Sequence, residues 1–82
     1  MATHTTGTIT RLDHTTAGVA VYMDADPKPA WFTLQSTHAT FNSCLSALIV
    51  GAAKGLRVRI DATAAWNNGD QDVPIGIVRV FY

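Results

Sequence analysis

The stretch FNSCLSALIVGAAKG (residues 41–55) decides how the rest of the chain is interpreted. Its apolar residues recur at helical spacing, and Gly55 follows the last of them, where a left-handed C-terminal cap belongs. Thr40 is the nearest N-cap candidate. The stretch carries a single charged residue, Lys54. A helix on the surface of a soluble domain ordinarily turns charged residues to water, so the outer side of this helix needs an explanation.

Two strands are predicted downstream of the helix. Residues 56–62 (LRVRIDA) alternate apolar and charged side chains, which is typical of a strand with one buried face. Residues 63–72 (TAAWNNGDQD) form a loop with a strong turn signal at Asn68-Gly69. Residues 73–82 (VPIGIVRVFY) form the last strand, and we expect a kink at Gly76.

Three strands are predicted upstream of the helix, at residues 7–13 (GTITRLD), 18–23 (GVAVYM) and 30–34 (AWFTL). Ile9 and Leu12 fall on opposite phases of the first strand, so we expect a bend or bulge between them. The turn DADPKP separates the second and third strands, because its two prolines cannot serve a sheet ladder.

This order, three strands, a helix and two strands, predicts one mainly β domain over residues 1–82. The fold that it favours is the OB-fold, a five-stranded Greek-key β-barrel with a helix between strands 3 and 4. A small α+β sandwich is the competing architecture.

Composition narrows the classes of function. Charged residues make up 15% of the 82 residues, against about 25% in an average soluble domain. The formal net charge is zero, which argues against a surface built for nucleic-acid phosphates. No run approaches the roughly 20 apolar residues that a membrane span requires. The opening MATHTTGTIT does not resemble a signal peptide, and the compartment stays open.

The helix projects two different faces at 100° per residue. The face expected to pack on the barrel holds Phe41, Cys44, Leu45, Leu48, Ile49, Gly51 and Ala52. The outer face holds small, mostly uncharged residues, and we expect it to pack against copies of the same helix in a homo-oligomer. The predicted interface residues are Ser43, Ser46, Ala47, Val50 and Ala53. The alternative is a surface helix that merely lacks charge.

The run FNSCLSALIVGAAKGLRVRID, the following WNNGD and the terminal strand resemble the receptor-binding B subunit of Shiga-type toxins. GTITRL and WFTL lie where that family has its first and third strands. The resemblance covers about residues 7–82. It implies an OB-fold, a ring of five subunits with the helices around a central pore, and glycan binding on one face of the ring. It also implies an A-chain as a partner and secretion of the protein.

Residue by residue, the resemblance assigns Phe32 to an aromatic of the family's sugar site and Phe41 to the aromatic that precedes the asparagine at the start of the helix. Asn68-Gly69 matches the family's Asn-Gly loop, and Asp13 is a loose match. Two features depart from the family. This chain has a single cysteine in place of the family's intrachain disulfide, and DHTTAG replaces an acidic loop. The resemblance therefore implies the ring more strongly than the same glycolipid receptor.

The residues themselves point to a ligand site in the loop before the last strand. Trp66 offers a flat apolar face, and the neighbouring Asn67, Asn68, Gly69, Asp70 and Asp72 bring amides and carboxylates for sugar hydroxyls. Trp31 and Phe32 alternate on a strand, so we expect one ring inside the barrel and the other to help the site. In the alternative interpretation Trp66 folds back over the barrel end and the asparagines serve only the turn.

No catalytic or metal site is predicted. His4, His14, His38 and Cys44 lack the spacing of a zinc site, and Cys44 lies on the helix face expected to be buried. Ser36, His38 and the aspartates form no recognisable triad pattern. We therefore expect no enzymatic activity, no cofactor and no metal.

The predicted function is a non-enzymatic, ring-forming homo-oligomer that binds a cell-surface carbohydrate. One alternative is an OB-fold that binds single-stranded nucleic acid, against which the lack of basic charge argues. The other is a structural oligomer without a ligand.

Overall fold

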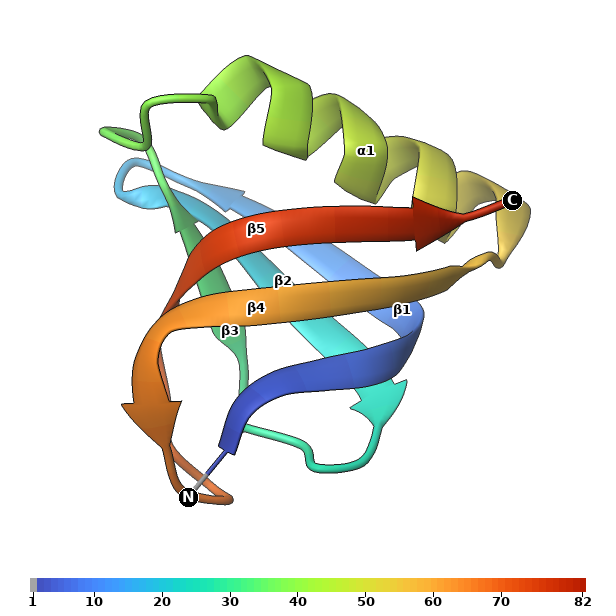
Figure 1. The fold of residues 1–82 in the computed structure, drawn as a ribbon. Coiled ribbons are helices and arrows are strands. Elements are labelled where there is room, and N and C mark those ends of the chain that lie inside the picture. Colours follow the sequence, from blue (N-terminus) through green and yellow to red (C-terminus); the bar gives the residue numbers. More distant parts are fainter. Residues whose placement is uncertain (1) are drawn as a thin grey trace.

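Five strands and one helix follow one another in the computed structural model, which describes residues 2–82. They are β1 (Ala2–Thr15), β2 (Gly18–Ala25), β3 (Phe32–Gln35), α1 (Phe41–Lys54), β4 (Arg57–Trp66) and β5 (Val73–Phe81). Compared with the sequence prediction, β1 begins five residues earlier and β4 extends four residues further. The order of elements agrees with the prediction (Figure 1).

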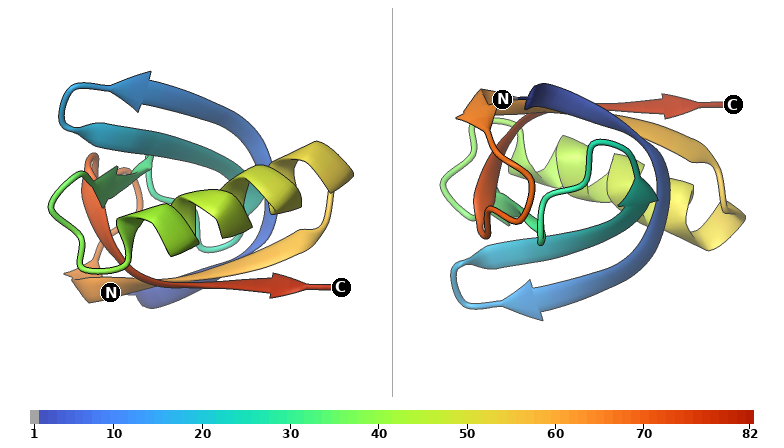
Figure 2. Two further views of the ribbon diagram at one scale, coloured as in Figure 1. Left: turned by 90° about the horizontal axis from the view of Figure 1, so that it is seen from above. Right: turned by 90° about the horizontal axis from the view of Figure 1, so that it is seen from below.

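The strands form a closed barrel in the order β1-β2-β3-β5-β4, with β4 returning to β1. β3 and β5 are parallel where Phe32 faces Val73, and the other neighbouring strands are antiparallel. The helix lies across one end of the barrel, and the loops after β2 and β4 lie at the opposite end (Figures 1 and 2). The chain thus has the predicted fold class, a small mainly β barrel of the OB type with one helix between β3 and β4.

Two bulges bend the barrel wall at the positions expected from the sequence. In β1 the register shifts between Ile9 and Arg11, and the intervening Thr10 donates its hydroxyl to the carbonyl of Tyr22 at 3.2 Å. In β5 the partners of Asp61 and Ala62 are Ile77 and Ile75, so Gly76 is the extra residue. Each bulge exchanges the inward and outward phases of its strand, which is why apolar residues change sides along both strands.

The helix has the predicted bounds. Gly55 takes a left-handed conformation (φ 63°), and the amide of Leu56 donates to the carbonyl of Gly51 at 3.0 Å. Thr40 occupies the N-cap position, but its side chain makes no capping hydrogen bond. Instead, its backbone amide donates to Nδ1 of His38 at 3.0 Å.

A narrow stripe of the helix enters the barrel mouth. Cys44, Leu48 and Gly51 are buried, and a Cβ on Gly51 would lie 2.6 Å from a methyl of Val58, so glycine lets the helix approach β4 closely. The prediction for Ile49 is wrong, since this side chain is 45% exposed. Ile49 lies beside the stripe, and the helix crosses the barrel end at a point where only one row of side chains reaches inside.

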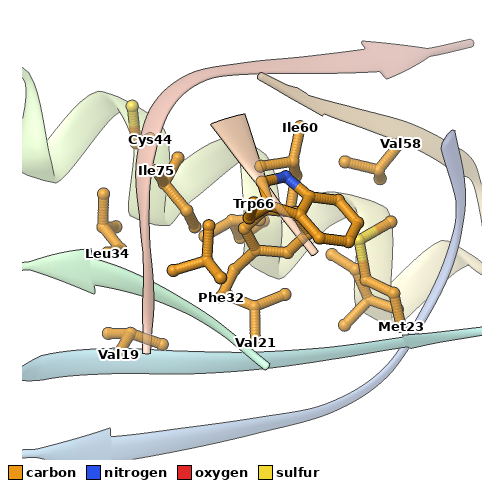
Figure 3. Packing of buried hydrophobic residues seen from close by; sticks show 13 residues of the cluster. Val19, Val21, Met23, Phe32, Leu34, Cys44, Val58, Ile60, Trp66 and Ile75 are labelled. Carbon is orange, nitrogen blue, oxygen red and sulfur yellow. The ribbon is translucent and has the colours of Figure 1, made fainter. Parts of the chain in front are cut away.

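The core fills the barrel from the helix to the opposite end (Figure 3). Val19, Val21, Leu34, Val58, Ile60 and Ile75 line the wall and are at most 2% exposed. At the end away from the helix, the rings of Phe32 and Trp66 meet edge to face, with centroids 5.6 Å apart and planes at 88°. These two rings close the lower part of the barrel.

Candidate functional site

Two of the predicted ligand residues belong to the core. Trp66 is 2% exposed and Phe32 is fully buried, so neither ring offers a face to a sugar. Trp66 lies at even spacing after the inward-facing Val58 and Ile60 of β4, although Ala64 between them is exposed, and this spacing could be seen in the sequence. The expectation that the Trp66 ring is exposed is therefore corrected, as is the sugar contact assigned to Phe32. Of the two neighbouring aromatics, Phe32 points inward, and Trp31 is half-exposed.

The polar loop after β4 is exposed from Asn67 to Asp72. The Asp70 carboxylate accepts a hydrogen bond from the amide of Asn67 at 2.9 Å, and the Asp70 amide donates back to the Asn67 carbonyl at 3.0 Å. Gly69 takes a positive φ of 89° within this turn. The carboxylate of Asp70 thus has a structural task, and the side chains of Asn67 and Asn68 border a hollow of about 370 Å³ beside Pro27.

This loop is joined to the start of β3. The amide of Ala30 donates to the carbonyl of Asp70 at 2.8 Å, and the amide of Val73 donates to the carbonyl of Trp31 at 3.2 Å. The Thr33 hydroxyl donates to the carboxylate of Asp72. The fold thus brings Asp72 and Trp31, which are far apart in the sequence, to one side of the barrel, although Trp66 is turned away from it.

On the same outer side, a row of three side chains crosses β1, β2 and the approach to β3. Arg11 is directly opposite Tyr22, and its guanidinium carbon lies 4.9 Å from the centre of the Tyr22 ring. The Tyr22 ring in turn lies 5.9 Å from the ring of Trp31, tilted by 39°. Since Arg11 covers Tyr22, Trp31 is the ring at the end of the row that remains for a ligand.

Arg11 is held in place by Asp13, two residues along the same face of β1. The guanidinium donates twice to the carboxylate, Nε to Oδ1 at 2.8 Å and Nη2 to Oδ2 at 2.7 Å. These hydrogen bonds lower the pKa of Asp13 below its ordinary value and raise the pKa of Arg11. The pair therefore stays charged over the whole physiological range and presents a fixed donor and acceptor beside the aromatic row.

The row lies on a face that OB-folds use for oligonucleotides and oligosaccharides, the surface of strands 2 and 3 between the loops that follow strands 1 and 4. The sequence prediction named Trp31 but missed Arg11 and Tyr22. The available signal was the bulge in β1, because it turns Arg11 outward and so aligns it with Tyr22. Together Arg11, Asp13, Tyr22 and Trp31 form the candidate site, which we call the aromatic row.

The predicted oligomer interface lies on α1, at the end of the barrel that the helix covers (Figure 1). Ser43, Ser46 and Ala53 are exposed, whereas Ala47 and Val50 are half-buried. A groove of about 260 Å³ runs between α1 and β5, lined by Ser43, Ala47 and the exposed Ile77 among others. The outer face of the helix thus consists of small, uncharged residues apart from Lys54 in its last turn, and it adjoins apolar surface on β5.

His38 and Cys44 have structural roles in the fold. Nδ1 of His38 accepts from Thr40, so Nε2 carries the proton and donates to the carbonyl of Gly76 at 2.9 Å, which ties the segment before the helix to the β5 bulge. Cys44 is a buried free thiol. In the described part of the chain, no three His, Cys, Asp or Glu residues are grouped as a metal site would require. No helix there has the length and apolar character of a transmembrane segment.

Comparisons with known proteins add no relative to this picture. No protein-family model matches the chain, and neither a curated protein nor a solved structure matches it.

Proposed function

We propose that this protein is a non-enzymatic carbohydrate-binding module that works as a homo-oligomer, most simply a ring of five subunits. The observation that carries the proposal is the aromatic row. A half-buried tryptophan, Trp31, ends a row that runs through Tyr22 to an Arg11–Asp13 pair fixed by two hydrogen bonds, on the face where OB-folds bind oligosaccharides. Trp31 supplies the apolar surface on which a sugar ring stacks, and the pair supplies a donor and an acceptor for its hydroxyls.

The edge of β5 supports the oligomer. β5 pairs with β3 over only two residues, Val73 and Pro74, so within residues 2–82 the remainder of that edge has no strand partner. The exposed side chains of Ile77 and Phe81 lie on the same strand, and the outer face of α1, on which Lys54 is the one charged residue, lies beside it. A free strand edge next to apolar surface favours association with another chain, and a second copy supplies one without any further component.

The resemblance to the toxin B subunit supports the same arrangement. It suggests the ring with the helices around its axis, an A-chain as a partner and secretion. The family's glycolipid receptor is not part of the proposal, because Phe32 and Trp66 are buried here. The ligand that we propose is a neutral or acidic saccharide bound through Trp31.

The test is a glycan array followed by titration of the best saccharide. We expect a dissociation constant of about 1 mM for one site, and much tighter apparent binding to a dense glycan surface if several sites act together. Trp31→Ala should weaken binding at least about tenfold, since most of the stacking surface is lost. Tyr82→Ala is the matched control, because Tyr82 is a 93% exposed aromatic far from the row in sequence.

Three outcomes would contradict the proposal. An array on which the wild-type protein binds nothing favours a structural oligomer without a ligand. Binding of a single-stranded oligonucleotide through Trp31, with no binding of saccharides, favours the nucleic-acid alternative. Equal losses in Trp31→Ala and Tyr82→Ala show that the aromatic row is not the site.

A further inference from the structure

A second polar surface lies on the outward side of β1, β4 and β5. It carries Arg57 and Arg59 on β4 and Arg79 on β5, which are three of the six basic residues of the chain. Arg59 and Arg79 are directly opposite each other in the ladder. Since neighbouring strands are about 4.8 Å apart, two guanidiniums rooted at these positions reach the same point in front of the sheet. We call this surface the arginine face.

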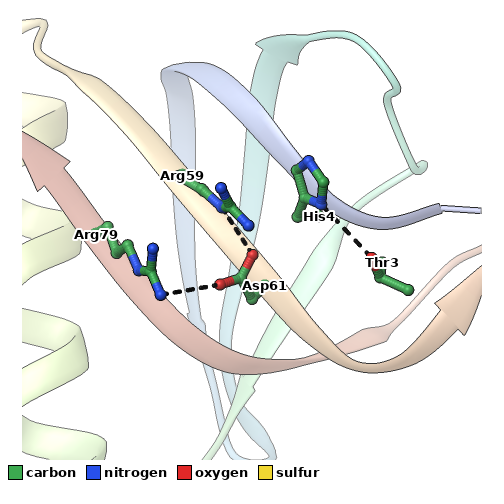
Figure 4. Close-up of polar contacts among 5 residues, drawn as sticks. All are labelled: Thr3, His4, Arg59, Asp61 and Arg79. Carbon is green, nitrogen blue, oxygen red and sulfur yellow. Dashed lines mark hydrogen bonds and ion pairs between the residues drawn. The ribbon is translucent and has the colours of Figure 1, made fainter.

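The opposed guanidiniums of Arg59 and Arg79 destabilise the fold unless an anion binds between them. Like charges directly across from each other destabilise a sheet. One carboxylate, Asp61, lies between the two: Nε of Arg59 donates to it at 2.9 Å, while Nη2 of Arg79 is 3.9 Å away, beyond hydrogen-bonding distance (Figure 4). Arg57 faces Phe81 across the ladder and has no carboxylate within 4 Å among residues 2–82. Three guanidiniums therefore face one carboxylate.

The zero net charge of the chain conceals this excess. Three of the six acidic residues, Asp26, Asp70 and Asp72, lie in the loops after β2 and β4, while Asp24 lies near the end of β2, directly opposite Thr8 and two strands from Arg57. Those loops are at the barrel end away from the helix, whereas the arginine face is on the barrel wall (Figures 1 and 2). The positive charge on the wall is thus a local property that an approaching anion would meet.

Hydroxyl groups complete the surface. Thr6 and Thr8 on β1 are directly opposite Arg59 and Arg57, so their side chains point to the same side of the sheet. The side chain of Arg79 is 55% exposed, and its contact with Asp61 is longer than that of Arg59. Arg79 can therefore turn to a ligand while Arg59 stays hydrogen-bonded to Asp61. Guanidiniums with hydroxyls beside them suit a tetrahedral oxyanion that is attached to a polyhydroxylated chain.

We propose that the arginine face binds a sulfated glycan. One sulfate is bound between Arg59 and Arg79, and Arg57 takes a second, while Thr6 and Thr8 meet sugar hydroxyls. A single-stranded nucleic acid fits less well, because base stacking needs a row of aromatics, and among the described residues of β1, β4 and β5 Phe81 is the one exposed Phe, Tyr or Trp. The site is separate from the aromatic row and does not depend on the function proposed for it.

The experiment is a titration with a size-defined heparin oligosaccharide at about 0.15 M salt, where remote charges are largely screened. Arg79→Gln and Arg57→Gln should each weaken binding about tenfold, because each removes a charged donor to a sulfate. Lys28→Gln is the matched control: it removes one positive charge from the loop after β2 and should leave the affinity unchanged. The same oligosaccharide without its sulfates should not bind.

Further measurements separate this proposal from its competitors. Trp31→Ala should keep heparin binding, so a failure of the aromatic row leaves this result intact. Arg79→Gln should melt no lower than the wild type, because it relieves the opposed charges, and a matched loss of binding is then not due to unfolding. The proposal is overturned if wild-type protein does not bind the oligosaccharide, or if Lys28→Gln weakens binding as much as Arg79→Gln. It is also overturned if an oligonucleotide of equal charge binds as tightly.

Discussion

At the scale of single residues, the direction of a ring separates a core residue from a ligand contact. Phe32 and Trp66 point into the barrel, and Trp31, next to Phe32 in the chain, points out. Alternation along the strand predicted that Trp31 and Phe32 point to opposite sides of the sheet. Which of the two points into the barrel is decided by the pairing of Phe32 with Val73, which the sequence does not show. The burial of Trp66 could have been predicted from its even spacing after Val58 and Ile60. The polar residues that follow Trp66 directly favoured an exposed position instead.

Replacing Trp66 should therefore affect folding more than binding. Trp66→Ala should lower the free energy of unfolding by about 3–5 kcal/mol, because it leaves a large cavity at the barrel end. Trp66→Phe should cost much less, since it keeps a ring against Phe32 and removes the indole Nε1, which is buried without a hydrogen-bond partner among residues 2–82. Denaturant unfolding measures both. A Trp66→Ala variant as stable as the wild type would contradict the core assignment.

The pair formed by Arg11 and Asp13 predicts a pH dependence. The hydrogen bonds from Arg11 lower the folded-state pKa of Asp13 below 3.8. A lowered carboxyl pKa stabilises the fold above the unfolded-state pKa, and that contribution is lost as the pH falls through the folded-state pKa. The stability difference between the wild type and Asp13→Asn should thus be present at neutral pH and vanish in strong acid. An NMR titration in which Asp13 has an ordinary pKa would show that the pair does not persist in solution.

At the scale of elements, the sequence was sufficient to predict those features that depend on neighbouring residues alone, such as the end of a helix or a bulge in a strand. The helix has its predicted bounds because Gly55 ends it with its own backbone conformation. Both bulges were visible as a change of apolar phase in β1 and a glycine in β5. Ile49 was mistaken because the width of the buried stripe depends on the barrel mouth under the helix, which no helical projection contains.

Gly18 and Gly55 both have a positive φ, but only Gly18 is tightly packed, so replacing each by alanine distinguishes the cost of backbone conformation from the cost of a steric clash. Gly18 has a φ of 143°, and a Cβ there would lie 2.0 Å from the carbonyl oxygen of Leu34, so Gly18→Ala should cost about 3 kcal/mol or more. Gly55 has a φ of 63° with nothing within 4 Å of the added Cβ, so Gly55→Ala should cost only about 1 kcal/mol. Chemical unfolding of the two variants tests the order. The reverse order would mean that β2 and β3 adjust easily at Gly18.

At the scale of the whole molecule, the distribution of charge could not be predicted. The sequence gives a net charge of zero, and alternation shows that Arg57 and Arg59 share a side of β4. The position of Arg79 across from Arg59 depends on the register of β5, which the Gly76 bulge shifts by one residue. The aromatic row is likewise a product of register, since Arg11, Tyr22 and Trp31 come from three segments.

The proposed assembly predicts that added charge on the outer helix face separates the subunits. Ser46→Glu and Val50→Glu would bring like charges together around the ring axis and should lower the mass measured by light scattering. Thr16→Glu adds the same charge at the exposed turn between β1 and β2 and serves as the control. A wild-type protein that is monomeric at all concentrations would end the ring proposal, as would unchanged mass in both helix variants.

Closure of the barrel also has a consequence for how the chain reaches its fold. The second half of β1 meets β2 through a tight hairpin, from Thr15 opposite Gly18 onward, whereas its first half waits for β4, with Ala2 opposite Trp66. The hairpin can form in about 1–10 μs, but pairings this distant in sequence place small barrels in the millisecond-to-second range. During synthesis, the start of β1 therefore stays without its partner until residues 57–66 have been made. During that interval, nascent chains that lie close together can pair wrongly with one another through the free part of β1.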